Sequence, residues 1–333
     1  MLTLPRFAFL QPASLDEALG HLAEHGAESL IVAGGTDAVP NLKHRLHEPR
    51  YVVHIARLRE LHFVRHEADG LHLGPLVTLS ELAREERVGA EFPSLARAAG
   101  LVAGPQLRNM GTVGGNLCLD TRCTYYNQTY FWRESLGFCL KKCGELCHVV
   151  PAGKRCVAAH SSDVAPMLIA LEAEVEIATP SARTPAARRR VSVDEFFVAD
   201  GIHNNVLAPG ELVTEVFVPA RSRGLNTGYQ KLRPRAAIDF PMLSVAFAAR
   251  MRAGACEDAR LVVSAIAARP RVITGIDSLA RGRPLDDAVA GEIAQAAWKQ
   301  CHPLINVAYD ADYRRQMVPV VVRRAVRQAR GED

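Results

Sequence analysis

The 333-residue sequence contains no run of about eighteen apolar residues, and this absence excludes an ordinary membrane-spanning helix. Its first residues also lack the basic start, long apolar stretch and small-residue cleavage site of an export signal. We therefore expect a cytoplasmic protein without a membrane partner. Charge of one sign is not in excess either, because 40 basic residues face 36 acidic ones, and a net charge of +4 gives no reason to expect a nucleic-acid partner.

Composition and length predict a globular α+β protein of more than one domain. Hydrophobic residues make up 48% of the chain and charged residues 23%, which excludes a mainly disordered or fibrous protein. We expect a small N-terminal part at residues 1–57, a second part at 58–220 and a C-terminal part at 221–333. Residues 118–157 are rich in cysteine and aromatic side chains and have no lasting periodicity, so we interpret them as an insertion.

The spacing of apolar residues predicts the regular elements. Helices are expected over 14–25, 79–86, 93–99, 165–171, 193–197, 276–281, 287–300 and 313–328. Strands are expected over 29–32, 51–55, 71–74, 173–179, 212–218, 227–232, 243–251 and 258–267. We also expect a turn through residues 180–190 and a kink or restart of the last helix at Pro319, which cannot donate a backbone hydrogen bond.

Two glycine turns indicate a site for phosphate groups. Gly34 and Gly35 follow a predicted strand, and a glycine pair lets backbone N–H groups converge on an anion. Such a pair is also common in tight turns without a ligand. A second turn at 111–116 again combines a hydroxyl, paired glycines and a small amide, and two such turns suit the two phosphates of a dinucleotide. Neither turn has the spacing of a Rossmann or P-loop motif.

Six of the eight cysteines lie between residues 118 and 156. Cys123, Cys139, Cys147 and Cys156 have fifteen, seven and eight residues between them, with Cys118 and Cys143 nearby. An iron–sulfur cluster accepts such loose spacing, whereas zinc sites favour close pairs such as C-x2-C. From the residues alone an iron–sulfur cluster, a zinc ion and buried or redox-sensing thiols all stay open.

Three motifs carry a resemblance to a known family: Ala33–Asp37, Gln106–Asn116 and Asp163–Leu168. They resemble the FAD-binding medium subunit of the xanthine dehydrogenase, or molybdenum hydroxylase, family over nearly the whole chain. The resemblance implies a two-part FAD-binding domain of the PCMH (vanillyl-alcohol-oxidase-like) type. A C-terminal α+β domain of antiparallel strands and helices, like that of the CO dehydrogenase flavoprotein, would follow it.

The resemblance also implies where FAD is held. Thr36 and Asn116 would supply side-chain contacts, Lys231 would lie close to the flavin, and Asp239 would belong to a loop near the flavin ring. The full set of implied FAD-binding residues is Val32, Ala33, Gly34, Gly35, Thr36, Asp37, Ala38, Val39, Gly111, Thr112, Gly114, Gly115, Asn116, Asp163, Lys231 and Asp239.

The insertion is similar to that of 4-hydroxybenzoyl-CoA reductase beta subunits. Asn116 and Asp163 are 47 positions apart, far more than in ordinary members of the family. The resemblance implies a 4Fe-4S cluster bound by Cys123, Cys139, Cys147 and Cys156. We expect the insertion to be separate from the FAD-binding turns.

The function implied by this resemblance is electron transfer within a larger complex. Electrons from ferredoxin would pass through the 4Fe-4S cluster and FAD to a 2Fe-2S small subunit and a molybdopterin-binding large subunit, in a dimer of heterotrimers. The large subunit would reduce 4-hydroxybenzoyl-CoA to benzoyl-CoA in aromatic degradation, so no catalytic residue is expected on this chain. Two alternatives stay open: the flavin subunit of an oxidative molybdenum hydroxylase, and a zinc-stabilised assembly module.

Overall fold

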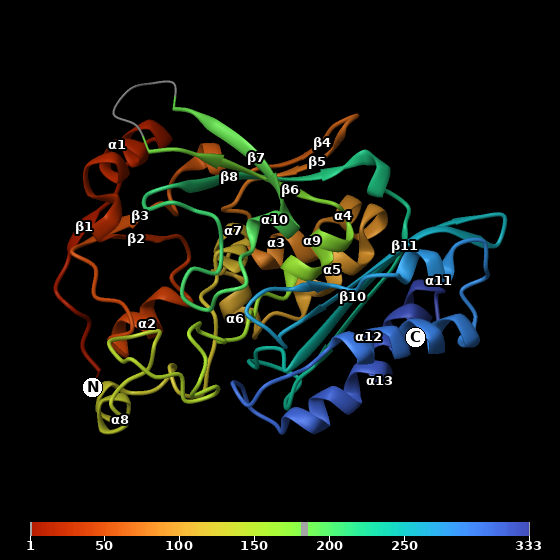
Figure 1. Cartoon of the computed structure of the whole chain (residues 1–333). Coiled ribbons are helices and arrows are strands. Elements are labelled where there is room, and N and C mark those ends of the chain that lie inside the picture. Colours follow the sequence, from red (N-terminus) through yellow and green to blue (C-terminus); the bar gives the residue numbers. More distant parts are fainter. Residues whose placement is uncertain (1, 181–185, 333) are drawn as a thin grey trace.

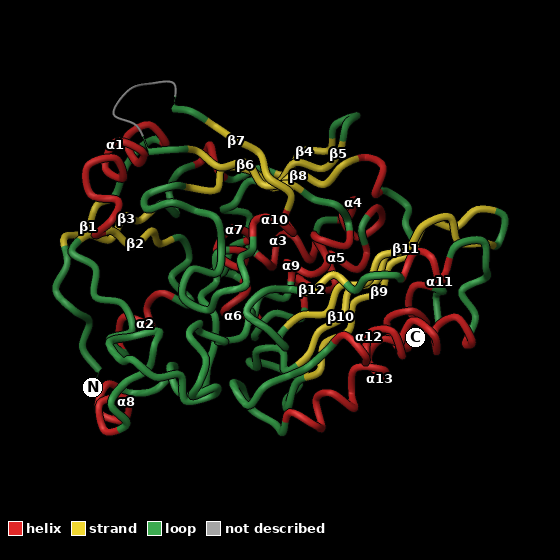
Figure 2. Tube along the Cα trace, in the orientation of Figure 1, coloured by secondary structure: helices red, strands yellow, loops and turns green. Residues whose placement is uncertain are grey.

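The chain folds into three β-sheets with helices packed between and around them (Figures 1 and 2). The computed structural model describes residues 2–180 and 186–332. The N-terminus lies beside the cysteine-rich insertion, and the C-terminus lies on the opposite side of the molecule, among the last helices (Figure 1). This mixture of helices and sheets confirms the α+β class.

The N-terminal part contains a three-stranded parallel sheet in the order β1-β3-β2. Its strands are β1 (Ala8–Leu10), β2 (Ser29–Val32) and β3 (Tyr51–His54). Helix α1 (Leu15–His25) begins after Ser14, whose hydroxyl accepts a hydrogen bond from the N–H of Glu17. Helix α2 (Ala38–Lys43) follows the first glycine turn, so strand β2 and helix α2 hold that turn between them.

The second part is an antiparallel sheet in the order β4-β5-β8-β6-β7, covered on one side by helices (Figure 1). Its strands are β4 (Val64–His66), β5 (Gly70–Leu73), β6 (Glu174–Ala178), β7 (Arg188–Ser192) and β8 (Leu212–Pro219). Its helices are α3 (Leu79–Arg84), α4 (Glu86–Glu91), α5 (Pro93–Gly100), α6 (Pro105–Arg108), α7 (Val113–Leu117), α9 (Val164–Ala170) and α10 (Val193–Phe196). Every residue of α9 is buried, because this helix lies between the second and third sheets.

The C-terminal part is an antiparallel sheet in the order β12-β11-β10-β9. Its elements are β9 (Asn226–Leu232), β10 (Leu243–Arg252), β11 (Ala255–Ser264), β12 (Arg271–Val272), α11 (Ile276–Ala280), α12 (Asp287–Gln300) and α13 (Ala311–Ala329). Val245 and Phe247 of β10 pack with the C-terminal helices, whereas Ala246 and Ala248 join the core of the second part. The alternation buries both faces of the sheet and fixes the C-terminal part on the second part.

The insertion is held by buried contacts to the other parts of the chain, although α8 (Tyr130–Ser135) is its one regular element among the described residues. The guanidinium of Arg133 donates to the carbonyl of His44 over 2.7 Å. In the C-terminal part, the side-chain amide of Asn306 donates to the backbone carbonyl of Val157. The backbone carbonyl of Asn306 accepts from the N–H of Thr124 over 2.8 Å. The insertion is therefore a fixed part of the fold.

Most predicted elements are confirmed, one expectation is wrong, and of the kink or restart expected at Pro319 the restart is excluded. The turn expected through 180–190 contains the start of strand β7, and the part of it at 181–185 lies outside the described residues. This edge strand contains three consecutive arginines, so it lacks the alternation of apolar and polar residues that predicts a strand. Their side chains pair with Glu176 in β6, Glu211 just before β8 and Glu215 in β8. Helix α13 does not restart at Pro319 but runs through it. None of the described helices, α13 included, is long and apolar enough to cross a membrane.

Packing between β9 and α13 gives a stability prediction. A Cβ atom on Gly228 would overlap the carbonyl oxygen of Ala325, so Gly228→Ala should destabilise the fold by about 2 to 4 kcal/mol. In α12 nothing lies within 4 Å of a Cβ on Gly291, and Gly291→Ala should stabilise the helix by about 0.5 to 1 kcal/mol. Urea unfolding of both variants checks the pair, and equal midpoints would contradict the close approach of β9 and α13.

Candidate functional site

A cavity of about 500 Å³ lies where the three parts of the chain meet. Both glycine turns line it, together with Asp163 at the start of α9, segment 118–122 of the insertion and the loop at 238–240. Ligand sites commonly form in such clefts between domains, from residues far apart in sequence. The cavity is therefore the first candidate for a cofactor site.

The two glycine turns touch each other directly at the cavity wall. A Cβ on Gly34 would overlap the carbonyl oxygen of Met110, and a Cβ on Gly111 would lie 3.3 Å from the hydroxyl oxygen of Thr36. Gly35 has a φ of +70°, which favours glycine. Glycine is thus required here for the close approach of the two turns.

The structure brings together all but three of the residues predicted to hold FAD. Val39, Gly114 and Lys231 do not line the cavity. A Cβ on Gly114 would come within 2.6 Å of the Cβ of Pro75, so this glycine serves the packing of α7.

Lys231 lies behind the cavity wall and contacts Asp163. The Asp163 carboxylate accepts hydrogen bonds from the ammonium of Lys231 and the hydroxyl of Tyr229, each over 2.8 Å. Burial raises the pKa of Asp163 and lowers that of Lys231, and their ion pair opposes both shifts. Asn116, beside Asp163, accepts hydrogen bonds from Ser162 and from the N–H of Val164, so the start of α9 is rigidly held.

Sequence reasoning missed the contribution of the insertion to the cavity, and the expectation that the insertion is separate from the FAD-binding turns is wrong. Arg122 forms an ion pair with Asp37 of the first turn, and its guanidinium stacks on the ring of Phe240 at 4.3 Å. Burial lowers the pKa of Arg122 to about 10, which leaves it charged at neutral pH. Cys118 is exposed and also lines the cavity. No spacing of residues in the sequence predicts these contacts.

The four cysteines predicted as ligands line one small pocket. Cys123, Cys147 and Cys156 are buried and Cys139 is partly buried. Burial, together with the neighbouring thiols, raises the pKa of Cys123 to about 11. The exposed Cys143 is not part of the lining.

The spacing of the sulfur atoms distinguishes between metals. A tetrahedral zinc site with Zn–S bonds of about 2.3 Å holds its sulfurs about 3.8 Å apart. Within residues 2–180 and 186–332, no three cysteine sulfurs lie within 4.8 Å of one another. The four cysteines, so spaced, do not form a tetrahedral zinc site.

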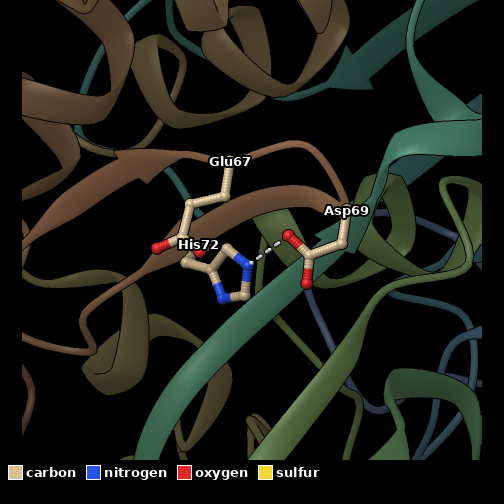
Figure 3. A group of neighbouring side chains, drawn as sticks. All are labelled: Glu67, Asp69 and His72. Carbon is tan, nitrogen blue, oxygen red and sulfur yellow. Dashed lines mark hydrogen bonds and ion pairs between the residues drawn. The ribbon is translucent and has the colours of Figure 1, made fainter.

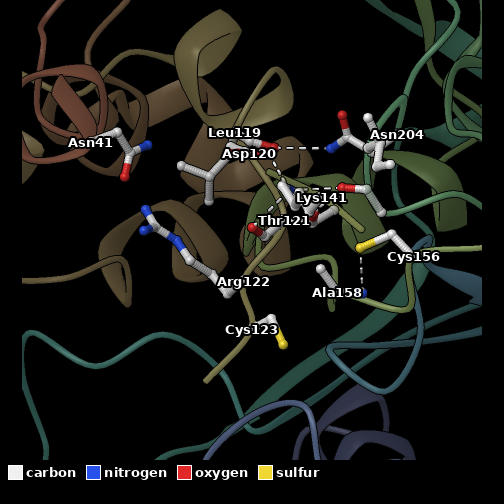
Figure 4. A network of polar contacts seen from close by, with 12 residues as sticks. Asn41, Leu119, Asp120, Thr121, Arg122, Cys123, Lys141, Cys156, Ala158 and Asn204 are labelled. Carbon is white, nitrogen blue, oxygen red and sulfur yellow. Dashed lines mark hydrogen bonds and ion pairs between the residues drawn. The ribbon is translucent and has the colours of Figure 1, made fainter. Parts of the chain in front are cut away.

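Lys141 connects the cysteine pocket with the glycine-lined cavity (Figure 4). Its ammonium donates to the carboxylate of Asp120 over 2.6 Å and to the carbonyl of Gly201 over 2.7 Å, and it lies 4.6 Å from the ring centre of Tyr126. Asp120 lines the cavity, and Lys141 lines the cysteine pocket. The two sites therefore share one wall.

A second group of possible metal ligands, Glu67, Asp69 and His72, lies on the β4–β5 hairpin (Figure 3). Both ring nitrogens of His72 are already engaged, at 3.1 Å from Asp69 and 3.1 Å from Glu215. Burial alone would lower the pKa of His72, but these hydrogen bonds outweigh it and raise the pKa. Arg190 also pairs with Glu215, so we interpret the group as a charge network within the sheet.

Comparison with known proteins decides the family. The family described as "FAD binding domain in molybdopterin dehydrogenase" matches residues 5–221. The chain belongs to this family. The "CO dehydrogenase flavoprotein C-terminal domain" matches residues 228–329. The match supports FAD as the cofactor of this molybdopterin dehydrogenase family member.

Relatives and solved structures agree with this assignment. The carbon monoxide dehydrogenase medium chain of Hydrogenophaga pseudoflava is 27% identical over 98% of this chain and 97% of its own length. The aldehyde oxidoreductase FAD-binding subunit of Escherichia coli is 33% identical over 65% of this chain and 69% of its own. The solved carbon monoxide dehydrogenase of Hydrogenophaga pseudoflava covers 99% of both chains at 26% identity and a TM-score of 0.79. The predicted fold class is confirmed.

The cavity generates a prediction at Gly115, which is exposed and lines it. The nearest atom to a Cβ there is the hydroxyl oxygen of Thr112 at 3.0 Å, so Gly115→Val should fill the cavity without unfolding the chain. We expect loss of bound FAD, measured as flavin absorbance per purified chain, with an unchanged circular dichroism spectrum. Gly89→Val in α4, where nothing lies within 4 Å, is the control that should keep flavin. Stoichiometric flavin in Gly115→Val would exclude this cavity as the FAD site.

Proposed function

We propose that this chain is the electron-transfer subunit of a molybdenum-dependent oxidoreductase and that it binds FAD and a 4Fe-4S cluster. The observation that carries the proposal is the wall shared by the glycine-lined cavity and the four-cysteine pocket. When bound, FAD exchanges one or two electrons and an iron–sulfur cluster exchanges one, so the pair suits a relay. The chain's own part is to bind both groups and fix their separation.

The cavity residues divide into two groups in this proposal. The first glycine turn, with Thr36, would receive the diphosphate of FAD through backbone N–H groups. The second turn lines the cavity beside it and Asn116 would contact the cofactor there, but the N–H groups of this turn at Gly111, Gly114 and Gly115 already donate within the fold. The loop with Ile238, Asp239 and Phe240 offers apolar side chains suited to a flavin ring. The carboxylate of Asp163 would face the cofactor. Lys231 forms an ion pair with it, so the role of Lys231 is to position this carboxylate.

The cysteine pocket supports a cluster through the chemistry of its lining. Four thiol groups converge in a largely buried pocket, and the ammonium of Lys141 beside them offsets negative charge. Tyr125 and Tyr126 cover the pocket from water. A zinc-stabilised assembly module is the alternative that the sulfur spacing disfavours.

The partner subunits and the direction of electron flow are properties of the whole complex, and we propose them from the relatives and the resemblance. The names of the relatives as medium chains support a large and a small partner, which we propose hold molybdopterin and 2Fe-2S centres in a dimer of heterotrimers. The resemblance of the insertion to that of 4-hydroxybenzoyl-CoA reductase beta subunits implies reduction of 4-hydroxybenzoyl-CoA with ferredoxin as donor. The relatives' names, carbon monoxide dehydrogenase and aldehyde oxidoreductase, instead favour an oxidative hydroxylase, which is our second candidate.

Iron content tests the cluster. Cys139 lines the pocket and Cys143 does not. Anaerobically purified wild-type chain and Cys143→Ala should each contain about four irons, and Cys139→Ala should lose them, as measured by iron analysis and by electron paramagnetic resonance after reduction. Iron lost in Cys143→Ala but kept in Cys139→Ala would make the ligand set wrong. Zinc without iron in the wild type would support the assembly module.

Electron entry is tested in the whole complex carrying Cys147→Ala. If the insertion receives electrons from ferredoxin, reduction of 4-hydroxybenzoyl-CoA should fail with reduced ferredoxin. It should persist with a reduced viologen, which is small enough to reach the remaining centres. Equal ferredoxin-dependent rates in variant and wild type would contradict entry at the cysteine pocket. A complex that only oxidises its substrate would support the second candidate.

A further inference from the structure

Four aspartates line the glycine-lined cavity, and each has a basic partner. The pairs are Asp37 with Arg122, Asp120 with Lys141, Asp163 with Lys231 and Asp239 with Arg235. FAD carries two negative charges on its diphosphate, so an unpaired carboxylate in this cavity would repel it. Pairing of the aspartates is therefore a condition for binding.

Of these four partners, Arg122 alone lines the cavity itself. It pairs with Asp37, which directly follows the first glycine turn, where we propose that the diphosphate lies. Asp37 has its other oxygen occupied by the amide of Asn41, which donates over 2.9 Å. The position of Arg122 thus decides the charge that the first turn presents to a ligand.

The backbone segments that carry the lining of the cysteine pocket fix the position of Arg122. Its backbone N–H donates to the carbonyl of Ala159 over 2.8 Å, and its carbonyl accepts from the N–H of Ala159 over 2.7 Å. The next residue, Cys123, and the neighbour of Ala159, Ala158, both line the cysteine pocket. The side chains of Arg122 and Cys123 point in opposite directions from the chain, the first toward Asn41 (Figure 4).

We propose that Arg122 is a positioning residue for FAD, which neutralises Asp37 at the first glycine turn and is held in place by the backbone that carries Cys123. The inference rests on the proposed function, in that FAD is the occupant of the cavity. Without Arg122 the carboxylate of Asp37 faces the cavity uncompensated and repels the diphosphate. Removal of the Asp37 charge then removes the need for Arg122.

Titration of the full-length chain with FAD, followed by flavin fluorescence, tests the pair. We expect Arg122→Met to weaken FAD binding by at least about tenfold, which corresponds to about 1.4 kcal/mol. The double variant Arg122→Met/Asp37→Asn should bind FAD nearly as well as wild type, because no charge is left unpaired. Asp37→Asn alone should bind as well as wild type or better, and this isosteric change keeps the test valid if Arg122→Met does not fold.

The control is Arg281→Met, which breaks an exposed ion pair with Asp277 in the C-terminal part and should leave FAD binding unchanged. Arg122→Met binding FAD like wild type would overturn the inference, and so would failure of Asp37→Asn to rescue it. An Asp37→Asn chain that binds FAD tenfold more weakly would also overturn it, since Asp37 would then contact FAD favourably. A wild-type chain that binds no FAD would instead contradict the proposed function.

Discussion

The site depends on the contact between two turns that lie about 75 residues apart in the sequence. Gly34 approaches the carbonyl of Met110 so closely that a Cβ would overlap it. This contact joins the parallel sheet of the N-terminal part to the helices of the second part and creates the cavity between them. A larger residue at position 34 would separate the two turns and open the wall of the cavity that both of them line.

The cysteine-rich insertion extends this arrangement. Segment 118–123 begins at the cavity and ends in the cysteine pocket, so a few residues separate the two sites. Contacts of Arg133, Lys141 and Asn306 fix the insertion to all three parts of the chain. A segment with so little regular structure is ordered by such contacts, and its position relative to the cavity is consequently fixed.

The regular elements could be predicted from the spacing of apolar residues along the sequence. Helix α12 matches its predicted bounds because apolar spacing defines it. The four cysteines that the resemblance grouped together line one pocket. What could not be predicted depends on long-range packing. The stacking of Phe240 on Arg122 and the placement of Lys231 behind Asp163 arise where the C-terminal sheet meets the second part. Ile238, which lines the cavity, has a φ of +74°, a conformation rare for a β-branched residue and invisible to propensity.

Buried cations have two different kinds of partner in this chain, and the difference explains the use of glycine at the site. Arg133 and Arg314 donate to backbone carbonyls away from the glycine-lined cavity, and they stabilise the packing of the chain. The cations beside that cavity pair with aspartates, so little positive charge is left over for a ligand. In the proposed function the diphosphate of FAD would then be received mainly by backbone N–H groups of the first turn, which reach it only where no Cβ intervenes. Gly34 and Gly35 meet this requirement, and a lysine or arginine in their place would add charge but close the approach. At the second turn glycine serves packing instead, because the N–H groups of Gly114 and Gly115 donate to Pro75 and Thr112.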